Sequence, residues 1–146
     1  MRFFNILVFL LTSIPNIIMC QNDLNYFSNL TEEEKNIIIF KGTEPPFSGK
    51  YNNHFEEGVY CCKACNSELF KSSHKFKSSC GWPSFDDEIE GAIVRKKDYS
   101  FGMSRTEIIC SKCSGHLGHV FTGENLTKMN LRHCVNSTSL IFISKR

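Results

Sequence analysis

Two Cys-x-x-Cys pairs limit the possible folds of this chain more than any other feature of its sequence. Cys62 and Cys65 form the first pair, Cys110 and Cys113 form the second, and residues 66–109 separate them. Each short turn can present two thiolates to one ion, and four thiolates suit tetrahedral zinc. Redox-active pairs or two disulfides are alternatives, but a disulfide across so short a loop gives little stabilisation, and no βαβ pattern surrounds either pair. The spacing therefore predicts one structural zinc site.

The chain has 8 cysteines, so four lie outside these pairs. Cys61 could replace Cys62 as a ligand, but the spacing favours Cys62, and the alternation of a strand would turn Cys61 away from it. Cys20 lies at the edge of an apolar N-terminal segment. Cys80 and Cys134 stand in polar surroundings, where a cysteine can be half of a disulfide, a buried thiol or a nucleophile.

The first twenty residues differ in composition from the rest of the chain. A basic residue, Arg2, precedes an apolar run over residues 3–11, and Pro15 lies shortly after that run. This order is typical of a secretory signal peptide. The apolar run is too short to span a bilayer well. An apolar helix of the mature protein is the alternative. We therefore predict a signal or targeting peptide at 1–20, leading to the secretory pathway or an organelle, and one domain at 21–146.

The remaining sequence predicts a mainly β domain with one short N-terminal helix. Thr31 and Glu34 form a capping box before an apolar run, and the Gly- and Pro-rich segment 41–51 ends the helix. Short β patterns come next, split by turns, at 58–62, 68–70, 92–96, 106–110, 116–121 and 139–144. These patterns indicate an antiparallel all-β fold. The chain has 17 Lys and Arg residues against 15 Asp and Glu residues, so we expect no nucleic-acid partner. We also expect the protein to be a monomer.

Five stretches occur in the order in which the B-type methionine-(R)-sulfoxide reductases carry them, and the chain resembles that family. They are GTEPPFSGKY, VYCCKAC, CGWPSF, YSFGMSRTEIICSKCSGHLGHVF and LRHCVNSTSL, and they extend from residue 42 to 140. The resemblance implies two antiparallel β-sheets and one zinc ion held by the four paired cysteines. It also implies thiol-dependent reduction of methionine-R-sulfoxide, free or in oxidised proteins, as a repair of oxidative damage, with thioredoxin as the reductant.

The resemblance also assigns roles to the two cysteines that the zinc site does not use. Reduction of a sulfoxide requires two electrons, a nucleophile for sulfur and a proton for the departing oxygen. By resemblance Cys134 is the nucleophile, which becomes a sulfenic acid. Cys80 occupies the position of a resolving cysteine, which would condense with the sulfenic acid to a disulfide. An external thiol would then reduce that disulfide by exchange.

Polar residues near these cysteines fit the same chemistry. By resemblance His119 is the proton donor and His116 lines the site; zinc binding by either histidine is a weaker alternative, because four thiolates already fill a tetrahedral site. Arg132 lies two residues before Cys134 and could lower its pKa or orient an acidic partner. Asn136 lies two residues after Cys134, so both face the same side of an extended segment.

Aromatic residues are candidates for the wall that receives the S-methyl group of the substrate. Trp82 is the only tryptophan and lies in a Gly/Pro loop beside Cys80, so we expect its ring in the binding pocket. Phe121 and Phe85 could complete this wall. Packing in the core is the alternative for all three.

The chain departs from the family pattern at His133 and at residues 122–125. It also contains sequons for N-glycosylation, one of them beside Cys134. His133 stands where many members have Tyr or Phe, and TGEN (122–125) replaces acidic residues, so an acidic partner is missing or displaced to Glu124. Sequons for N-glycosylation occur at Asn29, Asn125 and Asn136, and a glycan on Asn136 would block the site.

Two other classes of protein stay open on the sequence alone. In a zinc-ribbon-like interaction module Cys134 would be inert and would react slowly with alkylating agents. A secreted protein stapled by disulfides would hold no zinc and few free thiols.

Overall fold

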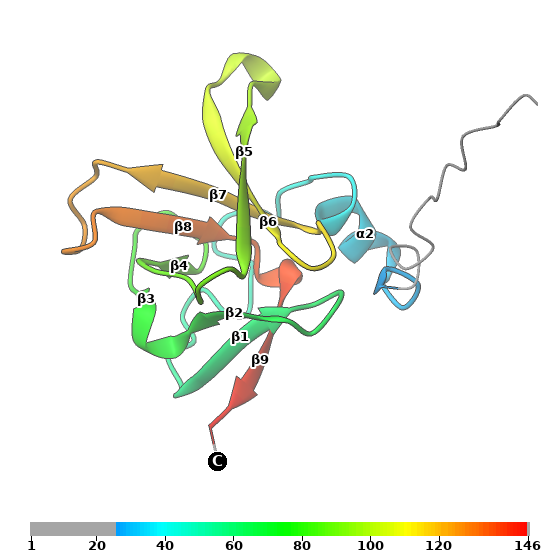
Figure 1. Cartoon of the computed structure of the whole chain (residues 1–146), viewed down its shortest axis with the longest axis horizontal. Helices are drawn as coiled ribbons and strands as arrows, with labels where there is room; N and C mark the ends of the chain where they lie inside the picture. The colour runs from blue at the N-terminus through cyan, green and yellow to red at the C-terminus, as the bar shows by residue number, and fades with distance from the viewer. Residues whose placement is uncertain (1–25, 146) are drawn as a thin grey trace, which may run out of the picture.

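The computed structural model describes residues 26–145, in which two antiparallel sheets form most of the fold (Figure 1). The prediction of a mainly β fold with two antiparallel sheets and a short N-terminal helix is confirmed. The predicted targeting peptide at 1–20 lies outside the described residues, so the predicted boundary with the domain at 21–146 stays a prediction. In the described part of the chain no helix is long and apolar enough to cross a membrane.

The smaller sheet has the strand order β2-β1-β9, and the larger has the order β3-β4-β8-β7-β6-β5. The smaller sheet contains β1 (Gly58–Cys62), β2 (Glu68–Lys71) and β9 (Leu140–Ser144). The larger contains β3 (Lys75–Phe76), β4 (Ser84–Phe85), β5 (Ile93–Asp98), β6 (Arg105–Cys110), β7 (His116–Thr122) and β8 (Leu131–Val135). The short 3-10 turns are η1 (Ser72–His74), η2 (Ser100–Gly102) and η3 (Ser137–Ser139).

Helix α2 (Glu32–Ile38) begins at the predicted cap. The backbone N–H of Glu34 donates to Thr31 Oγ1 at 3.2 Å, and the backbone N–H of Thr31 donates to the Glu34 carboxylate at 2.9 Å. The helix buries Ile37 and Ile38, and Ile38 packs against the turn just before β7. The capping box fixes the start of α2. The apolar face of the helix packs beside the β6–β7 turn (Figure 1).

The core contains large apolar side chains that are fully buried. They are Tyr60, Leu69, Phe70, Phe85, Ile108, Leu117 and Val135, which come from both sheets. The ring of Phe85 stacks on that of Phe70, with the centroids 4.4 Å apart. Phe85, for which the sequence allowed either the substrate pocket or the core, therefore belongs to the core.

Three strands of the larger sheet have no clear signal in the sequence. Strands β3 and β4 have 2 residues each, too few to form a pattern. In β8 the polar residues Arg132 and His133 are both buried, which removes the alternation of apolar and polar side chains expected of a strand. The central strand β8 is thus hidden in the sequence, although it carries Cys134.

Candidate active site

Strand β8 places Cys134 between β4 and β7 in the larger sheet. In the strand register Cys134 lies opposite Ser84 of β4 on one side and opposite His119 of β7 on the other. The Cys134 side chain is partly exposed. Pairing on both sides fixes its backbone, so the sulfur lies at a defined position beside a histidine.

Cys80 lies in the loop that precedes β4, and this loop brings it to Cys134. The two Sγ atoms are 3.8 Å apart, and both thiols are free. The hydroxyls of Ser78 and Ser84 lie 2.9 and 3.4 Å from the Cys80 sulfur. A disulfide bond needs an S–S distance of about 2.05 Å, so a small shift of the loop would join the two cysteines.

The contact between the two sulfurs shifts their pKa values in opposite directions. The hydrogen bond from Cys134 lowers the pKa of Cys80 to about 4, with further help from the Ser78 and Ser84 hydroxyls and against the effect of burial. The same hydrogen bond to Cys80, together with burial, raises the pKa of Cys134, while the charge of Arg132 acts in the opposite direction. One proton held between the two sulfurs near neutral pH would account for both shifts and would leave one thiolate available.

This shared proton leads to a pH-dependent reactivity. A lowered pKa means that the thiolate exists above that pKa and is lost only as the pH falls through about 4. We expect iodoacetamide to alkylate this pair readily at pH 6, where ordinary thiols are almost fully protonated. In the Cys134→Ala variant the stabilising hydrogen bond is gone, so alkylation of Cys80 at pH 6 should slow by about 10- to 100-fold. Mass spectrometry of the labelled peptides measures this change, and an unchanged rate would contradict the shared proton.

Cys134 lines a small cavity of about 120 Å³. Its walls are formed by Thr43, Trp82, Arg105, Gly118, His119, Phe121, Cys134, Val135 and Asn136. The predicted aromatic residues Trp82 and Phe121 are both in this wall. An apolar surface beside a thiol and an imidazole suits a small group that carries both a methyl and a polar oxygen.

Each of the two histidines has a carboxylate partner that could not be read from the sequence. His119 Nε2 lies 2.7 Å from Asp98 Oδ2, and Asp98 also accepts a hydrogen bond from Arg105 at 2.8 Å. His116 Nδ1 lies 2.8 Å from a Glu107 oxygen. His119 lines the cavity, so its ring can deliver a proton there.

His116 lies behind His119, outside the small cavity. Its ring meets that of His119 edge-on, with 5.6 Å between the centroids. Burial lowers the pKa of His116, against the effect of Glu107. Glu107 in turn accepts a hydrogen bond from Lys41 at 2.9 Å. His116 thus contacts the His119 ring and begins a hydrogen-bonded row that continues through Glu107 to Lys41.

Arg132 pairs with Glu124, the acidic residue that the sequence offered as a displaced partner. The guanidinium donates two hydrogen bonds to the Glu124 carboxylate, at 2.7 and 2.8 Å, and it lies 4.5 Å from the centroid of the Phe121 ring. Two parallel bonds of this kind fix the plane of the guanidinium. Glu124 therefore holds Arg132 under a wall of the cavity and close to Cys134.

His133 and Asn136 make contacts that the sequence did not indicate. His133 is fully buried, and its ring lies 2.6 Å from the Glu88 carboxylate. The Asn136 side chain accepts from the backbone N–H of Glu44 at 3.1 Å and donates to the carbonyl of Leu117 at 3.2 Å. Asn136 is 3% exposed, so its sequon is inaccessible in the folded protein.

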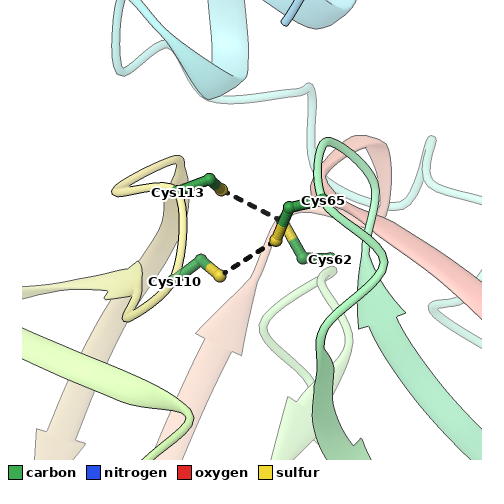
Figure 2. Close-up of side chains that lie close together, drawn as sticks. All are labelled: Cys62, Cys65, Cys110 and Cys113. Carbon is green, nitrogen blue, oxygen red and sulfur yellow. Dashed lines mark hydrogen bonds between the residues drawn. The ribbon is translucent and has the colours of Figure 1, made fainter. Parts of the chain in front are cut away.

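The two Cys-x-x-Cys pairs meet at one point, as Figure 2 shows. The Sγ atoms of Cys62 and Cys113 are 3.6 Å apart, those of Cys65 and Cys110 are 3.5 Å apart, and all four lie within 4.8 Å of one another. Zinc bound to four thiolates at about 2.3 Å would separate the sulfurs by about 3.8 Å. The four buried cysteines are therefore suitably placed to hold one metal ion, and Cys61 is not part of the group.

The sequence of the domain matches a known family. A SelR domain covers residues 30–144, which is most of the chain. The chain belongs to the SelR family of B-type methionine sulfoxide reductases. Over 123 residues it is 51% identical to the peptide methionine sulfoxide reductase MsrB of Teredinibacter turnerae, covering 84% of this chain and 90% of the relative. It is 49% identical over 119 residues to the MsrB of Pseudomonas fluorescens, covering 81% and 91%.

One relative in the SelR family comes from a plant organelle. The chloroplastic peptide methionine sulfoxide reductase B2 of Arabidopsis thaliana is 51% identical over 114 residues, which cover 77% of this chain and 55% of the plant protein. Membership of the family agrees with the resemblance read from the motifs.

Three acidic residues near the site were not predicted from the sequence: Asp98, Glu107 and Glu44. All three lie in or beside the five motifs. Their position as polar residues in or beside a motif was the only signal that could have identified them.

Proposed function

We propose that this protein reduces methionine-R-sulfoxide to methionine, and that Cys134 is the nucleophile. The observation that carries the proposal is the pair of free thiols, 3.8 Å apart, of which Cys134 lines a small cavity together with His119 and Trp82. The names of the relatives in the SelR family support the same reaction. A zinc-ribbon-like module with an inert Cys134 would leave this arrangement unexplained.

In the first step the Cys134 proton passes to the Cys80 thiolate, and the Cys134 sulfur attacks the sulfoxide sulfur. His119 supplies a proton to the sulfoxide oxygen, so the substrate sulfur then carries both a hydroxyl group and a bond to the Cys134 sulfur. The hydroxyl group moves from the substrate sulfur to the Cys134 sulfur as the bond between the two sulfurs breaks. Cys134 becomes a sulfenic acid, and the substrate sulfur keeps the electron pair and leaves as the thioether of methionine. Arg132, held by Glu124, stabilises the negative charge that forms on Cys134.

In the second step the Cys80 thiol attacks the sulfenic acid of Cys134 and releases water. The product is a Cys80–Cys134 disulfide, which a dithiol protein such as thioredoxin returns to two thiols while it becomes a disulfide itself. The partly exposed position of both sulfurs supports this exchange. Thioredoxin as the reductant and a monomeric enzyme are parts of the proposal.

The Cys80→Ser variant tests the order of these steps. We expect it to release about one equivalent of methionine per enzyme molecule and then to stop with thioredoxin as reductant, because no second thiol can clear the sulfenic acid. The measurement is a single-turnover assay with separated R and S epimers, followed by trapping of the sulfenic acid. Sustained turnover with thioredoxin would rule out Cys80 as the resolving residue.

We further propose that Cys62, Cys65, Cys110 and Cys113 hold one zinc ion. Four thiolates fill a tetrahedral site and leave no position open, so the ion supplies stability and takes no part in the reaction. The cysteines lie at the ends of β1 and β6, which belong to different sheets. The metal would therefore join the two sheets at one end.

For the N-terminal residues 1–20 we propose a targeting peptide. Two chloroplastic relatives, from Arabidopsis thaliana and Oryza sativa, support delivery to an organelle, and entry into the secretory pathway is the other destination. Asn29 and Asn125 are exposed, so these two sequons could accept a glycan on the secretory route. Buried Asn136 could not accept one after folding.

A further inference from the structure

Glu44 is a buried acidic residue that the proposed reaction does not use. It lies in the segment between α2 and β1, and only 6% of it is exposed. A buried carboxylate is costly unless hydrogen bonds stabilise it. The contacts of Glu44 therefore indicate what its position in the fold requires.

The Glu44 carboxylate caps the turn that comes after the strand of Cys134. It accepts hydrogen bonds from the backbone N–H of Ser137 at 2.6 Å, the backbone N–H of Thr138 at 3.0 Å and the hydroxyl of Thr138 at 2.7 Å. These donors open the 3-10 turn η3, directly after Asn136. The carboxylate thus fixes the direction in which the chain leaves β8.

The backbone of the same residue holds two walls of the cavity. The N–H of Glu44 donates to Oδ1 of Asn136 at 3.1 Å, and its carbonyl accepts from Nε1 of Trp82 at 3.0 Å. Both Asn136 and Trp82 line the cavity at Cys134. One residue therefore connects the indole, the amide and the turn after β8.

The rest of this segment is packed closely on the same turn. A Cβ atom on Gly49 would collide with the Ser137 side chain and would lie 2.5 Å from a carboxylate oxygen of Glu44. The backbone N–H of Tyr51 donates to the Ser137 hydroxyl at 3.1 Å. The segment is therefore held against η3 at several points, and Glu44 has little freedom to move.

We propose that Glu44 is a positioning residue, which sets the separation of Trp82 and Asn136 on either side of the sulfoxide pocket. The proposal rests on the proposed reductase function. Glu44 does not touch the reacting sulfurs; it acts through the indole and the amide that it holds. Without its carboxylate, the backbone N–H groups of buried Ser137 and partly buried Thr138 lose their acceptor and the turn relaxes.

The test compares Glu44→Gln and Glu44→Ala with the control Glu34→Gln. Glu34 is also a carboxylate that accepts a hydrogen bond from a backbone N–H, that of Thr31, but it lies on α2 and does not line the cavity. In Glu44→Gln the shape is kept, while an amide NH₂ replaces one of the two oxygens, each of which accepts from a backbone N–H. We expect kcat/KM for the R epimer to fall by about 10- to 100-fold, mainly through a higher KM, because the pocket is misplaced.

Trp82, the only tryptophan of the chain, gives a readout that does not depend on activity. We expect its fluorescence to shift to longer wavelength in both Glu44 variants, since the backbone carbonyl that accepts from the indole is no longer held in place by the carboxylate and the indole becomes more exposed. Alkylation of the Cys80–Cys134 pair at neutral pH should stay within about twofold of the wild type, because the thiol pair is intact. The Glu34→Gln control should keep both the emission and the kcat/KM of the wild type.

A folded Glu44→Gln protein with wild-type KM and wild-type Trp82 emission would overturn the proposal. The Gln variant decides the matter if Glu44→Ala does not fold. An inactive wild-type protein would refute the reductase function, and the Trp82 emission would still report whether Glu44 holds the indole. The two ideas can therefore fail separately.

Discussion

Replacing Cys134 with serine is expected to abolish reduction of methionine-R-sulfoxide, with a loss of kcat/KM of at least about a thousandfold. A serine hydroxyl is not ionised at neutral pH and cannot take up oxygen as a sulfenic acid, so both the nucleophile and the electron donor are lost. The partner sulfur of Cys80 cannot take over, because it lies in a loop and not on the strand opposite His119. An assay with separated R and S epimers and a chemical dithiol as reductant measures the loss.

The matched control for this variant is Cys61→Ala. Cys61 is a free thiol that is fully buried and belongs neither to the metal cluster nor to the cavity. We expect it to lower stability slightly and to leave kcat/KM within about twofold, since it touches no reacting group. Normal multiple turnover by Cys134→Ser would refute the assignment of the nucleophile.

Loss of the metal is expected to have the largest effect on stability. In Cys110→Ser we expect the zinc to be lost and the free energy of unfolding to fall by about 5 kcal/mol or more. The physical reason is that Cys110 ends β6 of the larger sheet, while Cys62 ends β1 of the smaller one, so an ion held by the four cysteines would join the two sheets. Metal analysis of the purified protein and its thermal unfolding curve measure the two effects.

Treatment of the wild-type protein with a strong chelator should reproduce this result without any mutation. The Cys61→Ala variant is again the control, since Cys61 is the direct neighbour of a proposed ligand but is not one itself. We expect it to keep one zinc ion per chain. A metal-free protein that unfolds at the wild-type temperature would contradict a stabilising role for the four cysteines.

Local spacing explains which features could be predicted. The two Cys-x-x-Cys pairs indicated a common metal site because each turn fixes two sulfurs by itself, whatever surrounds it. The capping box of α2 was equally readable, since Thr31 and Glu34 meet within one turn. Cys134 and Asn136 are two positions apart in an extended segment, which predicted that their side chains face the same side. Both residues line the cavity.

Strand register explains which features were missed. His119 meets Asp98, and His116 meets Glu107, only because β5, β6 and β7 pair in one alignment, with a bulge between Ile108 and Ile109. A shift by one residue would turn each carboxylate to the other face of the sheet. No spacing along the chain shows which alignment occurs, so these partners could not be assigned from the sequence.

By itself the sequence determined the mainly β fold, the four cysteines that gather at one point and the family to which the domain belongs. Each of these depends on contacts within a turn or on motifs in a fixed order. Only the tertiary structure decided that Phe85 packs in the core, that Glu124 pairs with Arg132, and that Glu44 reaches the turn after Cys134. These contacts join residues from separate segments, and their geometry exists only after the two sheets have packed together.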